Sequence, residues 1–204
     1  MAGTGTGAGG RRGSAGTGAG KAAALARLLH QDCSRLLDLY MEREAFLSEV
    51  TVAQERIVTP SPALGRLPPS EQLRLLHSAL QQCLGLLQDV MARENEDFGV
   101  DDKGEYGRLQ NTVKDRLEHL LGSTKLLLVS RDGTAALTPA REVTDGLEKG
   151  NSFSLKVWIY RVLQELIHWM LTAWQTLQAL QSRREKEPAR AARRGRRGKD
   201  GLRK

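Results

Sequence analysis

The amino-acid sequence predicts an all-α protein, a long-chain four-helix bundle with up-up-down-down order and two long crossover loops. Three observations lead to this prediction. Leu, Ala, Gln, Glu and Arg dominate the middle of the 204-residue chain, and aromatic residues make up only 4% of it. Apolar residues recur there at the spacing of amphipathic helices, without an alternating run of Val, Ile and Thr that would indicate a strand. The connections between the expected helices are long, short and long, which favours two crossovers.

The first expected helix spans about residues 21–49. A proline- and glycine-rich break follows it, which ends the helical pattern before Ser70. Along the expected helix, one face collects Leu25, Leu29, Leu36, Tyr40 and Leu47.

The second expected helix spans about residues 71–95. Ser70 is a suitable N-cap, and Glu71 complements the positive end of the helix dipole. The apolar face of this helix contains Leu73, Leu76, Leu80, Leu84, Leu87 and Met91.

The third and fourth expected helices span about residues 103–129 and 152–184, separated by a second long connection with several glycines. The apolar face of the third helix contains Tyr106, Leu109, Val113, Leu117, Leu120, Leu121 and Leu128. That of the fourth contains Leu155, Ile159, Val162, Leu166, Met170 and Ala173.

The prediction of up-up-down-down order rests on the lengths of the connectors between the helices. A helix of about 25 residues is roughly 37 Å long, so a connector between two successive parallel helices must return that full distance. About 20 extended residues can do so. The alternative is an ordinary up-down-up-down bundle with flexible loops.

Charge and composition divide the chain into three parts. Residues 1–20 are rich in glycine and are expected to be disordered, and residues 21–182 form the helical domain. Residues 183–204, a basic tail that is also expected to be disordered, carry 11 Lys and Arg against three acidic residues, which leaves −1 for residues 1–182. A basic nucleic-acid-binding core is therefore not expected. The tail itself fits three uses, namely a solvated tail, an anchor on a polyanion or membrane surface, and a nuclear or nucleic-acid signal.

Other classes of function find little support. The chain contains no glycine-rich phosphate loop and no paired nucleophile and base, so neither an enzyme nor a cofactor is expected. Cys33 and Cys83 lie in phase with apolar faces, which favours two buried reduced thiols over a disulfide. The acidic residues around Glu94 are expected to be solvated. No metal site is expected, because no ligand spacing links the cysteines to His30, His77, His119 and His168.

A Phe and a Lys begin the fourth helix. At about 100° per residue, Phe153 lies about 140° from the centre of the apolar face, and Lys156 lies roughly 80° from it on the same flank. An outward-pointing Phe beside a Lys is typical of a docking site on a partner protein. The alternative is that Phe153 packs the preceding loop against the helix. Trp158 is a candidate either for supporting this site or for contacting the partner, and Trp158, Trp169 and Trp174 are all expected to be half-buried at helix seams.

The segment that follows, Lys-Val-Trp-Ile-Tyr-Arg-Val-Leu-Gln-Glu-Leu-Ile-His-Trp from Lys156 to Trp169, resembles the fourth helix of the ciliary neurotrophic factor group of interleukin-6-type cytokines. Members of this group have a Phe-x-x-Lys pair at the same place. The resemblance extends more weakly over residues 22–182, and its specific part is the last helix. The chain departs from the group's pattern at Ser154 and Leu155, where the group has Glu-Lys, and in its basic tail.

The resemblance implies a cytokine or neurotrophic growth factor that assembles cell-surface receptors and starts JAK-STAT signalling by kinases inside the cell. The implied partners are ciliary neurotrophic factor receptor alpha, the leukemia inhibitory factor receptor and glycoprotein 130. Phe153 and Lys156 would bind the leukemia inhibitory factor receptor. Because residues 1–20 contain no apolar signal region and no run is long enough to span a membrane, the chain is expected to be cytoplasmic and to act outside the cell after release without a signal peptide. A cardiotrophin-type cytokine and an intracellular helical adaptor with a basic tail are the alternatives.

Overall fold

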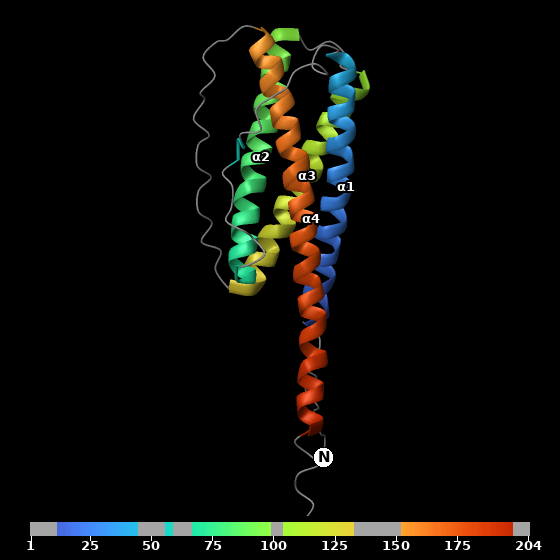
Figure 1. Ribbon diagram of the computed structural model, residues 1–204, viewed down its shortest axis with the longest axis vertical. Coiled ribbons are helices and arrows are strands. Elements are labelled where there is room, and N and C mark those ends of the chain that lie inside the picture. Colours follow the sequence, from blue (N-terminus) through green and yellow to red (C-terminus); the bar gives the residue numbers. More distant parts are fainter. Residues whose placement is uncertain (1–11, 45–55, 59–66, 99–103, 133–151, 198–204) are drawn as a thin grey trace, which may run out of the picture.

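The computed structural model of the protein describes residues 12–44, 56–58, 67–98, 104–132 and 152–197. These residues form four helices and no strand, and the helices pack side by side as a bundle (Figure 1). The predicted all-α four-helix bundle is therefore confirmed. The helices are α1 (Arg12–Arg43), α2 (Pro69–Phe98), α3 (Gly104–Asp132) and α4 (Ser152–Arg197).

Each helix of the bundle packs mainly against two others. Helix α1 lies mainly against α4 and α3, and α2 lies mainly against α3 and α4. The C-terminal ends of α1 and α2 meet the N-terminal ends of α3 and α4 at one pole (Figure 1). Most of the residues predicted to form the two long connections lie outside the described ranges.

A short described piece of the first connection, residues 56–58, lies beside α4. Val58 is buried in the core, and Arg56 Nη1 lies 3.8 Å from Glu165 Oε1 in the middle of α4. These three residues therefore pack against the bundle beside the middle of α4.

The start of the second helix differs from the sequence prediction. Helix α2 begins at Pro69, because the carbonyl of Pro68 accepts the first helical hydrogen bond, from the amide of Gln72 at 3.0 Å. Proline is well suited to a first helical position, since its φ is fixed and it has no amide to satisfy. Ser70, the predicted N-cap, therefore lies inside the first turn.

Helix α1 also begins earlier than predicted, and helix α4 ends later. Helix α1 begins at Arg12, within the segment that was expected to be disordered, and Ala19, Ala22, Ala23 and Ala26 are buried. Small side chains of this kind let neighbouring helices approach closely. At the other end of the chain, α4 continues to Arg197, beyond the start of the predicted disordered tail at residue 183, and extends past the other helices (Figure 1).

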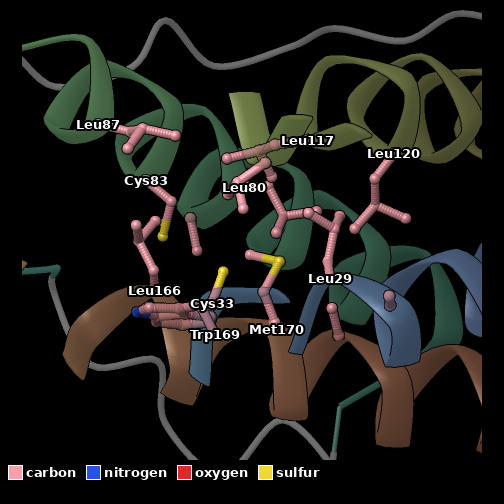
Figure 2. Close-up of a cluster of buried hydrophobic side chains, with 14 of the residues drawn as sticks. Leu29, Cys33, Leu80, Cys83, Leu87, Leu117, Leu120, Leu166, Trp169 and Met170 are labelled. Carbon is pink, nitrogen blue, oxygen red and sulfur yellow. The ribbon is translucent and has the colours of Figure 1, made fainter. Parts of the chain in front are cut away.

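The predicted apolar faces form the core. All six residues of the predicted α4 face are buried, as are the central leucines of the other three helices. Figure 2 shows leucines from all four helices around Cys33 and Cys83, with Met170 and Trp169 of α4 beside them. Both cysteines are free and fully buried, as predicted, and burial raises the pKa of both thiols. Their thiolate forms are therefore disfavoured at neutral pH.

One histidine is enclosed between α2 and α3. The side chain of His77 is buried, and its Nδ1 lies 2.8 Å from Thr124 Oγ1. The Thr124 hydroxyl donates to the carbonyl of Leu121, so its oxygen is available to accept from the His77 ring. Burial, reinforced by the positive charge of Lys125, lowers the pKa of His77.

This histidine predicts a loss of stability in weak acid. In the unfolded chain His77 takes up a proton near pH 6.5, whereas in the folded chain its pKa is lower. The contribution of His77 to the free energy of unfolding is therefore complete above pH 6.5 and decreases as the pH falls below it. The melting temperature should therefore decrease from pH 7.5 to pH 5.5. His77→Gln, which cannot titrate, should flatten the decrease. A small slope should persist because burial also lowers the pKa of His168. Equal slopes for the two proteins would contradict the prediction.

Candidate functional site

Phe153 lies in the first turn of α4 and is 48% exposed. Among the described residues, the other large apolar side chains with comparable exposure are Leu28, Leu126 and Val129, none of them aromatic. The sequence prediction that the Phe153 ring points outward is therefore confirmed. Residues 133–151, which precede α4, lie outside the described part of the chain, so the alternative that Phe153 packs against this loop stays a prediction.

The Lys156 side chain is more buried than the interpretation of an outward-facing docking site implied. Its side chain is only 22% exposed, and its Nζ lies 2.7 Å from Glu44 Oε2 at the end of α1. The Glu44 side chain itself is only 8% exposed. An angle of roughly 80° from the centre of the apolar face corresponds to a helix seam rather than to open solvent. Lys156 therefore lies at the seam between α4 and α1.

A buried tyrosine adds a second link between α1 and α4. The hydroxyl of Tyr40, whose side chain is fully buried, donates to the carbonyl of Lys156 at 3.0 Å. Burial raises the pKa of Tyr40, so this hydroxyl keeps its proton at neutral pH and remains a donor. The first turn of α4 is thus held through both the side chain and the backbone of Lys156.

A buried carboxylate joins the other two helices to this pole. Glu94 of α2 is fully buried; its Oε1 lies 2.6 Å from Arg43 Nη2, and its Oε2 accepts from Gln110 Nε2 at 2.6 Å. Tyr106 Oη lies 3.5 Å from the same Oε2 and also accepts from Gln110 at 3.0 Å. The Arg43 guanidinium lies over the rings of Tyr40 and Tyr106, 5.0 and 4.5 Å from their centres.

We call this group the polar cluster. It contains two cations and two carboxylates, so its formal charge is balanced, and it draws on all four helices. Its members are Tyr40, Arg43, Glu44, Glu94, Tyr106, Gln110 and Lys156.

Trp158 lies on another side of α4. Its ring is partly buried, and the guanidinium of Arg93 from α2 lies 4.7 Å from its centre. Trp158 therefore belongs to the seam between α4 and α2, whereas Lys156 belongs to the seam with α1. The structure brings Phe153 and Lys156 together in one turn and places Trp158 beside α2.

The other two tryptophans also lie at seams. Trp174 is partly buried, and the Arg27 guanidinium lies 5.7 Å from its ring centre. Trp169 is buried rather than half-buried as expected, and its indole Nε1 donates to Glu165 at 2.9 Å.

Sequence reasoning missed most of the polar cluster. The acidic residues around Glu94 were expected to be solvated, and this expectation was wrong for Glu94. A signal was present, because Glu94 follows Leu80 and Leu87 at seven-residue steps and therefore shares their buried face. Likewise, Glu44 lies four residues after Tyr40, on the face that α1 turns toward the bundle.

Two further findings concern the described residues. No helix among them is long and apolar enough to cross a membrane. Within the same ranges, no three His, Cys, Asp or Glu side chains gather in a way that could hold a metal ion.

Comparison of the chain with protein-family models and with curated proteins finds no match.

Proposed function

We propose that the protein is a helical cytokine of the ciliary neurotrophic factor type that binds and assembles cell-surface receptors. The observation that carries this proposal is the half-exposed Phe153 in the first turn of α4, next to Lys156. An exposed aromatic side chain on a rigid helix loses little conformational freedom on binding, and such residues contribute strongly to protein interfaces.

The arrangement of the helices supports the same proposal. The meeting of two C-terminal and two N-terminal helix ends at one pole fits up-up-down-down order. The contact of residues 56–58 with the middle of α4 fits a long crossover between α1 and α2. This order is typical of helical cytokines.

The proposed partners are the ectodomains of ciliary neurotrophic factor receptor alpha, the leukemia inhibitory factor receptor and glycoprotein 130. Phe153 enters an apolar pocket of the leukemia inhibitory factor receptor, and the Lys156 ammonium pairs with a polar or acidic group beside it. Assembly of the receptor chains then activates the kinases attached to them inside the cell.

Receptor binding tests this proposal. The full chain should bind an immobilised leukemia inhibitory factor receptor ectodomain and should stimulate kinase signalling in cells that carry all three receptor chains. Relative affinity for the alpha receptor would separate this assignment from a cardiotrophin-type cytokine. A chain that binds none of the three ectodomains would instead favour an intracellular helical adaptor.

The basic tail supplies a separate prediction about polyanions. Eleven basic residues against three acidic ones in residues 183–204 should attract heparin with strong salt dependence. A chain that ends at Ser182 keeps Leu180, which is buried, and should still fold and bind receptor. It should lose retention on heparin at low salt.

The matched control keeps the full length of the chain but replaces the tail's Lys and Arg residues by Gln. It should elute from heparin with the truncated chain. Unchanged elution of the truncated chain would show that the tail is not the polyanion-binding segment.

A further inference from the structure

We propose that Glu44 is a positioning residue of the receptor-binding site, which holds the Lys156 ammonium and the first turn of α4 in the geometry that the partner recognises. This inference rests on the proposed function of Phe153 and Lys156. It adds to that site the residue that directly follows α1.

The contacts of Glu44 support this role. Its Oε2 lies 2.7 Å from Lys156 Nζ, and its Oε1 lies 3.4 Å from Arg43 Nε. Arg43 is held in turn by the fully buried Glu94 at 2.6 Å. The carboxylate of Glu44 is therefore fixed between two cations and is itself almost completely buried.

A lysine ammonium has three donors, so the pair with Glu44 does not by itself use all of its hydrogen-bonding capacity. An unrestrained lysine would lose rotamer freedom on binding, and that loss weakens the affinity. Glu44 removes much of this loss before binding, because it holds the lysine in advance. At 22% exposure, Lys156 is still accessible from outside.

An alternative role for Glu44 predicts the opposite change in receptor affinity. If Glu44 instead competed with the partner for Lys156, removing its charge would strengthen binding. The test therefore compares the wild type, Glu44→Gln, Lys156→Met and the double variant. Lys156→Met keeps an unbranched side chain in the seam and removes the ammonium, with its charge and its three donors.

The first measurement does not depend on any receptor. Acetylation of lysines by a water-soluble ester is followed over time by mass spectrometry. Lys156 should react about two- to fivefold faster in Glu44→Gln than in the wild type. Lys114, which pairs with Glu118 on α3, should react at the same rate in both and serves as the internal reference.

The second measurement is affinity for the immobilised leukemia inhibitory factor receptor ectodomain. Glu44→Gln should bind about two- to tenfold more weakly than the wild type, and it should have no further effect in the Lys156→Met background. Glu71→Gln, which removes a carboxylate from an exposed ion pair at the start of α2, is the matched control and should bind like the wild type.

The outcomes separate this inference from the proposed function. An unchanged Lys156 acetylation rate in Glu44→Gln overturns the inference, and so does equal or tighter receptor binding by that variant. A wild-type chain that does not bind the receptor overturns the proposed function, and the acetylation rates alone then decide whether Glu44 restrains Lys156.

Discussion

Phe153→Ala is expected to weaken binding to the leukemia inhibitory factor receptor ectodomain about thirtyfold and to leave the fold intact. The Phe153 ring is 48% exposed, so its removal opens no core cavity, and the free energy of unfolding should change by about 0.5 kcal/mol or less. An aromatic side chain at the centre of an interface commonly contributes 2 kcal/mol or more to binding, which corresponds to about thirtyfold in affinity. Surface plasmon resonance and thermal unfolding of the same samples provide the two measurements.

The matched control for this variant is Leu126→Ala on α3. Leu126 is 72% exposed, so both variants remove a large apolar side chain from the surface. Only Phe153→Ala should reduce receptor binding and the phosphorylation that follows it in responsive cells. Normal binding by Phe153→Ala, or a loss explained by unfolding, would show that the first turn of α4 is not the binding site.

Lys156 needs separate treatment, because it is not a purely external side chain. Lys156→Ala would leave the Glu44 carboxylate, which is 8% exposed, without the cation 2.7 Å away. A loss of activity in that variant would combine a lost contact to the partner with a disturbed seam between α1 and α4. Phe153→Ala is therefore the cleaner test of binding.

The fold could be predicted from sequence because its main determinant is local. The three- and four-residue spacing of leucines specifies the buried face of each helix, and the residues of the predicted α4 face are all buried. The same angular argument placed Phe153 outside. These predictions need no knowledge of which helices are neighbours.

The polar cluster could not be predicted in the same way, because its contacts join residues that are far apart in sequence. Glu44 and Lys156 meet only because the end of α1 lies beside the start of α4, and Arg43 meets Glu94 only across α1 and α2. A charged residue on a helix gives no local sign of its partner. The extension of α4 to Arg197 was also missed, since proline, glycine and repeated like charges in that segment favour disorder.

Glu94→Ala is expected to produce the largest loss of stability of the variants considered, about 3 kcal/mol. The fully buried carboxylate accepts from Gln110 and pairs with Arg43, and its removal leaves both donors without this acceptor inside the bundle. Breaking one side of a buried ion pair typically destabilises a protein by 3 to 5 kcal/mol. The lower end applies here because the Arg43 side chain is 34% exposed and can regain some hydration.

Urea unfolding followed by circular dichroism would measure this loss, with Glu105→Ala as the matched control. Glu105 pairs with Arg35 at 3.3 Å, but its side chain is 62% exposed, so its removal should change stability by about 1 kcal/mol or less. Arg43→Met combined with Glu94→Leu should be less destabilising than Glu94→Ala alone, because the guanidinium that pairs with Glu94 is then removed together with it. A loss below about 1 kcal/mol in the free energy of unfolding of Glu94→Ala would mean that water can take the place of the carboxylate. The polar cluster would then not be what holds the four helix ends together.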